Sequence, residues 1–153
     1  FSGVKRRFTE VDVINSVRII DDYGHHPVEI AAVLKAARSV TQGRVIAVVQ
    51  PHRYSRVRDL WHEFSGCLFD ADTVLLAPIY EAGEAPLEGI THTALADAIR
   101  SHGHKDVSVT NETDLAADLK PRIKPGDIVV CLGAGSITHW AAGLAERLKT
   151  LTK

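Results

Sequence analysis

Short apolar runs alternate along the chain with longer segments that carry apolar residues at helical spacing. The runs are rich in Val, Ile and Leu and show little apolar–polar alternation, which is typical of strands buried on both faces of a parallel sheet. The predicted strands are Val17–Ile20, Arg44–Gln50, Thr73–Ala77, Val107–Thr110 and Asp127–Leu132, with a further short strand near Thr9–Ile14. This repetition restricts the chain to an α/β architecture.

The segments between the strands predict helices with recognisable ends. Pro27 suits a first helical position, Thr91 and Asn111 suit N-caps, and Gly43 and Gly103 lie where helices should end. The predicted helices are Val28–Val40, Arg56–Phe69, Thr91–Ser101, Glu112–Ile123 and Ile137–Leu148. We therefore expect a doubly wound, Rossmann-like, mostly parallel sheet of about six strands, with helices on both faces and right-handed crossovers.

Composition places the chain among ordinary globular domains. It has 153 residues, 45% hydrophobic and 24% charged, which is enough for one domain with its own core. A formal net charge of -1 gives no general attraction to nucleic acid or membranes. Cys67 and Cys131 lie in apolar runs, so we expect buried thiols in a reducing, cytoplasmic compartment. No methionine is present, even at position 1, and we expect a part of a longer protein.

Ligands of doubly wound sheets bind beyond the C-terminal ends of the strands. The loops at that edge would be Asp21–Pro27, Pro51–Arg56, Pro78–Gly89 and Gly133–Ser136. The first groups two acids, an aromatic ring and two imidazoles, which could bind a metal, accept bonds from ribose hydroxyls or move protons. Its alternative interpretation is a capped helix start in a solvated loop.

Cations dominate the second loop, in which His52, Arg53 and Arg56 lie near a predicted helix start. Guanidinium groups match carboxylates and phosphates, so these residues predict an anion site. The alternative is a basic surface loop paired with acidic side chains. The third loop, Pro78–Gly89, is long enough to be functional, although it could be only an exposed connection.

The fourth loop resembles a dinucleotide fingerprint only in part. Thr138 stands where the third glycine would be needed, so we exclude a nicotinamide site. The amides beside Gly135 and Ser136 could still hold an anion or substrate, and a tight strand-to-helix turn is the alternative.

The segments IDDYGHHPVEI, VVQPHRYSR and APIYEAGEAP together resemble the C-terminal domain of the Mur ligase family. The resemblance covers essentially all of residues 1–153, and residues 1–15 would include a linker from a central domain. It implies a ligase of three domains: one binds a UDP-sugar, the central one holds ATP and Mg²⁺, and this one closes over both. The chain has no phosphate-loop sequence, so we expect it to be inactive alone.

The resemblance also implies roles for particular residues. Arg7 matches an arginine that reaches the ATP phosphates, and Asp22 matches an aspartate that binds the ATP ribose. Tyr23 and His25 would line the same junction, with His25 as the catalytic group. The substrate-binding group would comprise Tyr23, His25, His52, Arg53 and Arg56, the last two holding the amino acid's carboxylate. No metal site is implied within this chain.

Several functions remain open from the sequence. Within the family, the motifs favour the branch that acts on UDP-N-acetylmuramate and L-alanine, and the alternative is the branch that recycles murein tripeptide. Outside it, a flavodoxin-like binding module is possible on these residues. The remaining alternative is a metal-dependent hydrolase using Asp21, Asp22, His25, His26 and His52.

Overall fold

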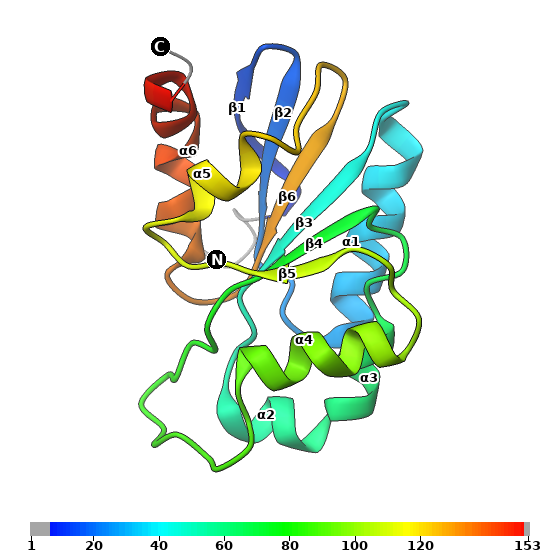
Figure 1. Cartoon of the computed structure of the whole chain (residues 1–153), viewed down its shortest axis with the longest axis vertical. Helices are drawn as coiled ribbons and strands as arrows, with labels where there is room; N and C mark the ends of the chain where they lie inside the picture. Colours follow the sequence, from blue (N-terminus) through cyan, green and yellow to red (C-terminus); the bar gives the residue numbers. More distant parts are fainter. Residues whose placement is uncertain (1–6, 152–153) are drawn as a thin grey trace.

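A computed structural model describes residues 7–151, so residues 1–6 of the predicted linker lie outside the described residues. The described residues form a 6-stranded sheet in the order β1-β2-β6-β3-β4-β5 (Figure 1). Edge strand β1 pairs antiparallel with β2, and the other pairings are parallel. The strands are β1 (Thr9–Ile14), β2 (Val17–Asp22), β3 (Val45–Val49), β4 (Thr73–Leu76), β5 (Val107–Val109) and β6 (Ile128–Leu132). The predicted fold class is confirmed.

Helices cover both faces of the sheet (Figure 1). They are α1 (Pro27–Val40), α2 (Tyr54–Asp59), α3 (Trp61–Gly66), α4 (His92–Ser101), α5 (Leu115–Leu119) and α6 (Ile137–Leu151). Successive strand residues point to opposite faces, so Ile20 packs with α1 to α4 while neighbouring Ile19 packs with α5 and α6. Two cores on one sheet explain why the strands read as continuous apolar runs.

Two helix predictions are wrong. The segment Arg56–Phe69 forms two short helices rather than one, because the backbone of Leu60 leaves the helical region, at φ -115 and ψ 28. The segment Glu112–Ile123 contributes only α5. Asn111 does not cap that helix; its side chain accepts the N–H of Asp114 at 2.8 Å in the preceding turn. Thr91, by contrast, caps α4 as predicted.

The strand register brings several chain segments to one edge. Asp22 pairs with Leu132, Leu132 pairs with Val49, and Val49 pairs with Leu76. These residues are the last of their strands. The loops that follow them therefore start side by side, although they are distant in sequence.

Candidate functional site

Asp22 ends β2 with a carboxylate that is only 3% exposed. One oxygen accepts the N–H of Gly24 and the other accepts the N–H of Phe8, both at 2.7 Å. A hollow of about 240 Å³ opens beside it. The hollow is lined by Arg7, Asp22, Tyr23, Gly24, Val28, Glu29, Ala32 and Val33. The two residues predicted to bind nucleotide, Arg7 and Asp22, thus meet in one place.

A capping box builds the turn between β2 and α1. His26 is the N-cap, its side chain accepts the N–H of Val28, and Glu29 accepts the N–H groups of His25 and His26 at 3.2 and 3.1 Å. Burial alone would raise the pKa of Glu29, but these N–H bonds and the charges nearby lower it overall. The turn therefore has a defined shape before any ligand binds.

The orientation of His25 follows from its hydrogen bond. Its Nδ1 lies 3.0 Å from the carbonyl oxygen of Tyr23. A carbonyl only accepts, so Nδ1 carries the proton in this contact. In the neutral ring, Nε2 then keeps the lone pair and is the nitrogen able to accept a proton.

A line of aromatic rings connects the first loop with the second and third. The ring of His25 lies 5.0 Å from that of Tyr23 and 5.4 Å from that of His52. His52 in turn stacks on Tyr80 at 5.6 Å. Nδ1 of His52 is buried and has no hydrogen-bond partner among the described residues. Burial, and then the electrostatic interactions with His25, Arg56 and Arg53, lowers the pKa of His52.

The predicted arginine pair borders a second hollow, of about 350 Å³. It is lined by His26, Arg53, Ser55, Arg56, Asp59 and Leu60. Arg53 is half-exposed, and its Nε lies 3.5 Å from a carboxylate oxygen of Glu84. The guanidinium of Arg56 has no hydrogen bond or ion pair within the described part of the chain. Among the described residues, Arg53 therefore has an acidic partner, whereas the guanidinium of Arg56 has none.

The start of α6 is largely occupied by protein groups. Gln50 accepts the N–H of Ile137 at 3.1 Å and donates to Oγ of Ser136 at 3.0 Å. A Cβ on Gly135 would lie 2.4 Å from the ring of Tyr80, so that ring rests on the glycine. The anion contact at Gly135 and Ser136 stays a prediction. The N–H of Ile137, which could have bound an anion, already donates to Gln50.

The structure separates the two neighbouring acids of the first loop. Asp21 points to the other face of the sheet, where it accepts a hydrogen bond from Thr138 at 2.6 Å. No group of three or more His, Cys, Asp or Glu side chains in residues 7–151 is placed to hold a metal ion. The arrangement expected of the metal-dependent hydrolase is therefore not formed.

Several residues that shape the site had no role predicted from the sequence. Gln50 holds α6, Glu29 completes the capping box, and Tyr80 and Glu84 support the second loop. The spacing from His26 to Glu29 was a usable signal, because a capping box needs an acid three residues after the cap. The other partnerships join distant segments and leave no local pattern.

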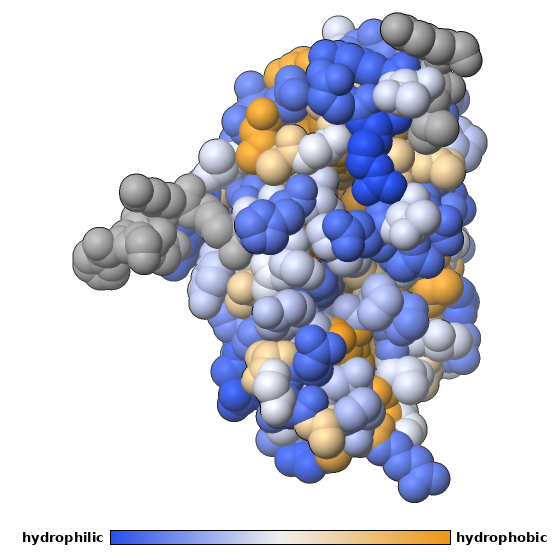
Figure 2. All heavy atoms as spheres, turned by 90° about the vertical axis from the view of Figure 1, so that its left-hand side faces the viewer, coloured by the Kyte–Doolittle hydropathy of each residue, from blue (hydrophilic) through white to orange (hydrophobic). Residues whose placement is uncertain are grey.

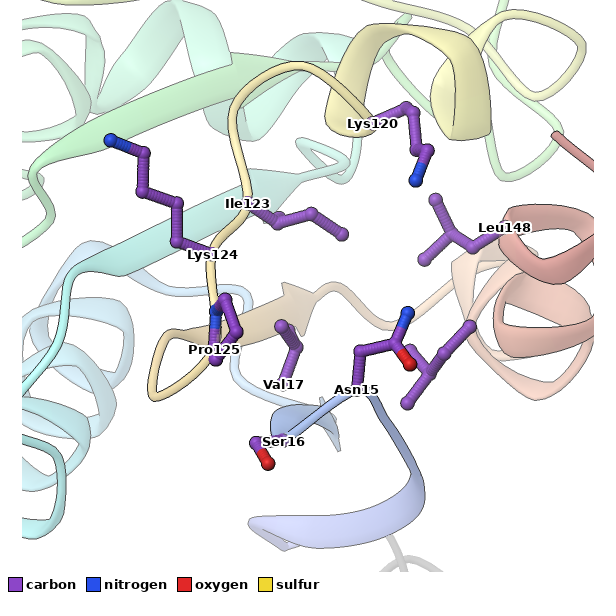
Figure 3. Close-up of a pocket in the computed structure, with 9 residues that line it drawn as sticks. Asn15, Ser16, Val17, Lys120, Ile123, Lys124, Pro125 and Leu148 are labelled. Carbon is purple, nitrogen blue, oxygen red and sulfur yellow. The ribbon is translucent and has the colours of Figure 1, made fainter. Parts of the chain in front are cut away.

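A larger hollow, of about 540 Å³, lies at the opposite end of the sheet (Figure 3). It is formed by the turn between β1 and β2, the segment before β6, and α6. Figure 3 shows Lys120 extending towards Leu148, whereas Lys124 points away. None of the predicted site residues lines this hollow, and we assign no function to it.

The side of the molecule shown in Figure 2 carries no large apolar patch among the residues coloured there. There the residues are mostly hydrophilic, and apolar ones form small separate groups. No helix within residues 7–151 has the length and apolar character needed to cross a bilayer.

The described residues form a doubly wound α/β domain with an aspartate-lined hollow and an arginine-lined hollow at one sheet edge, which is the place where domains of this architecture bind ligands. The chain belongs to the Mur ligase family, as its C-terminal domain: a family model described as "Mur ligase, glutamate ligase domain" matches residues 6–135.

Relatives within that family are closely similar over nearly the whole chain. UDP-N-acetylmuramate–L-alanine ligase of Maricaulis maris is 57% identical over 151 residues, which is 99% of this chain and 32% of the relative. The enzyme of that name from a Bradyrhizobium species is 59% identical over 152 residues, with the same coverage. The chain thus spans about a third of the length of these relatives.

Solved structures confirm the fold. UDP-N-acetylmuramate–alanine ligase from Thermotoga maritima matches with a TM-score of 0.74 and 23% identity, over 95% of this chain and 30% of that one. A murein peptide ligase from Psychrobacter arcticus matches with a TM-score of 0.66 and 20% identity, over 95% and 29%. These solved structures show the fold alone, and both relatives described above carry the name of the alanine ligase.

Proposed function

We propose that this chain is the domain of a UDP-N-acetylmuramate–L-alanine ligase that closes over ATP and holds L-alanine. The observation that carries the proposal is the 57% identity, across 99% of the chain, to a ligase of that name. The two hollows at the sheet edge support it, because each offers the chemistry that one of these substrates needs.

The hollow beside Asp22 suits the nucleoside part of ATP. Asp22 is buried, and its two accepted N–H bonds leave acceptor capacity for ribose hydroxyls, since a carboxylate has about four lone-pair positions. Val28, which is 71% exposed, and the adjacent Ala32 and Val33 offer apolar surface to a base. Arg7 lines the same hollow and supplies a guanidinium group suited to a phosphate.

The hollow beside Arg53 and Arg56 suits a small zwitterion. Arg56 can grip the carboxylate of L-alanine through two N–H groups, and Arg53 adds a second cation on the same rim. His26 lines this hollow, while Glu29 of the same capping box lines the other. The turn at the start of α1 is thus a shared wall, and the two substrates would meet across it.

His25 precedes the N-cap residue in the same turn, although it lines neither hollow, and it is our proposed catalytic residue. In the family's reaction the muramate carboxylate takes the terminal phosphoryl group of ATP, which gives an acyl-phosphate and ADP. The amine of L-alanine then attacks the acyl carbon, and inorganic phosphate leaves as the amide bond forms. The attacking amine must lose a proton, and Nε2 of His25 is the nitrogen left able to accept one. His52 and Tyr23 pack against His25 and limit the movement of its ring.

The remaining parts of the reaction belong to groups outside this chain. We assign Mg²⁺, the phosphate loop and the UDP-sugar site to the other domains of the full-length ligase. Phosphate release and peptide-bond formation by the isolated chain should therefore stay at background.

Replacing Arg56 by lysine in the full-length ligase tests the proposal. Lysine keeps the charge but loses the two-pronged guanidinium, so kcat/KM for L-alanine should fall about thirtyfold, while the KM for ATP stays unchanged. Steady-state kinetics with each substrate varied in turn, together with a thermal melt, make the measurement.

Arg58→Lys is the matched control. Arg58 lies in the same helix, but it is exposed and pairs with neighbouring Asp59 at 2.9 Å, so its replacement should leave every constant unchanged. An unaltered alanine constant in Arg56→Lys would refute the carboxylate role. Equal losses for all substrates with a lower Tm would instead make Arg56 a structural residue.

A further inference from the structure

We propose that Glu84 is a positioning residue for the amino-acid site, acting from the long loop 78–89 on Arg53 and on the start of α2. The inference rests on the proposed function, because it assumes that Arg53 and Arg56 bind L-alanine. Its physical basis is a set of contacts that joins the third predicted loop to the second.

Both oxygens of Glu84 hold the first turn of α2. One accepts the backbone N–H of Ser55 at 3.0 Å, and the other accepts the hydroxyl of Ser55 at 2.5 Å. The N-cap residue of this helix, Arg53, makes no side-chain capping bond of its own. Glu84 therefore satisfies a donor that a local cap would normally satisfy, from 29 residues further along the chain.

The same carboxylate orients Arg53. The oxygen that accepts the Ser55 hydroxyl lies 3.5 Å from Nε of Arg53. The bonds from the Ser55 side chain and backbone, and then the charge of Arg53, lower the pKa of Glu84, so it stays ionised at neutral pH. Because the contact uses Nε, the two terminal nitrogens of Arg53 remain available to a substrate carboxylate.

The loop that carries Glu84 is itself held in place. The backbone N–H of Glu84 donates to the carbonyl of Glu81 at 2.9 Å and closes a tight turn. In this turn Ala82 and Gly83 have positive φ angles of 50° and 82°. Glycine is the residue best suited to such a positive φ.

Before the turn, Tyr80 donates its N–H to the carbonyl of Pro51 at 2.8 Å and stacks on His52. Loop 78–89 thus contacts the segment from His52 to Ser55 at both of its ends and fixes its position.

Kinetics of the full-length ligase test the proposal. Glu84→Ala removes every contact of the carboxylate and should raise the KM for L-alanine about tenfold, with the KM for ATP and the Tm little changed. Glu84→Gln keeps the shape and can still bond to Ser55, but it loses the charge beside Arg53. It should recover most of the affinity, with a residual loss of less than about fivefold.

Glu81→Gln is the matched control. Glu81 is an exposed acid in the same turn, and its side chain makes no hydrogen bond or ion pair with the described residues. Its variant should match the unaltered enzyme. Amide hydrogen exchange adds a measurement independent of catalysis: the Ser55 N–H should exchange faster in Glu84→Ala than in Glu84→Gln or Glu81→Gln.

The outcomes separate this proposal from the one on which it rests. If Arg56→Lys weakens use of L-alanine but Glu84→Ala does not, Glu84 has no positioning role and the proposed function stands. If neither variant affects L-alanine, the arginine site itself is wrong. A general loss for all substrates with a lowered Tm in both Glu84 variants would make the residue structural and overturn the inference.

Discussion

At the level of single residues, the carboxylate of Asp22 holds two backbone N–H groups and is also our proposed acceptor for the ribose hydroxyls of ATP. One carboxylate oxygen accepts the N–H of Gly24 in the turn after β2. The other accepts the N–H of Phe8, which is next to Arg7, the residue proposed to contact a phosphate. A ribose bound there would share those oxygens. Loss of the charge should therefore affect both nucleotide binding and the position of the N-terminal segment.

We expect Asp22→Asn in the full-length ligase to raise the KM for ATP about ten- to a hundredfold and to leave the KM for L-alanine nearly unchanged. The amide side chain would have one acceptor oxygen in place of two, so one of the two bound N–H groups also loses its partner. Steady-state kinetics measure the effect. Asp21→Asn is the control, because Asp21 bonds to Thr138 on the opposite face. An ATP constant that responds equally to both changes would contradict the ribose role.

At the level of elements, the turn that leads into α6 packs closely against the candidate site. Gly135, just before the helix, lies against the ring of Tyr80, which in turn stacks on His52. A Cβ on Gly143, within α6, would meet no described atom within 4 Å apart from its chain neighbours and the backbone of the helix itself. The two glycines thus differ in what surrounds them.

Gly135→Ala should lower the free energy of unfolding by about 1–3 kcal/mol, because its methyl group would displace Tyr80. Gly143→Ala should raise it by about 0.5–1 kcal/mol, since alanine is the better helix former. Urea unfolding of both variants measures the difference. Equal changes of the same sign would show that Tyr80 does not depend on Gly135 for its position.

At the level of the whole molecule, partly buried imidazoles make stability depend on pH. Burial, and then the charges of His25, Arg56 and Arg53, lowers the pKa of His52 from 6.5, and burial lowers that of His92. The folded state therefore binds fewer protons than the unfolded state once the pH falls below 6.5. The free energy of unfolding must decrease as the pH drops through that range.

We expect a lower Tm at about pH 5.5 than at about pH 7.5, and a smaller difference in the His92→Gln variant. Replacement of His139, which is exposed, should leave the difference as it is. Thermal melts at the two pH values are sufficient. A His92→Gln difference as large as that of the unaltered chain would show that folding does not lower the pKa of His92.

The sequence by itself determined the strands, most of the helices and the sheet edge at which the candidate site lies. The apolar runs became strands β2 to β6, Pro27 and Thr91 began their helices, and the polar loops met at one edge because parallel strands end together. Hydrophobic periodicity and helix capping depend on residues that are close in sequence, so both can be recognised from the sequence alone.

Only the tertiary structure decided how the loops support one another. Glu84 reaches Ser55 across 29 residues, Gln50 reaches Ile137 across 87, and Tyr80 covers Gly135. The helical segment is interrupted at Leu60, where neither proline nor glycine marks the break in the sequence. Such contacts depend on the path of the whole chain, because a side chain's partner is fixed by strand order and register rather than by neighbouring residues.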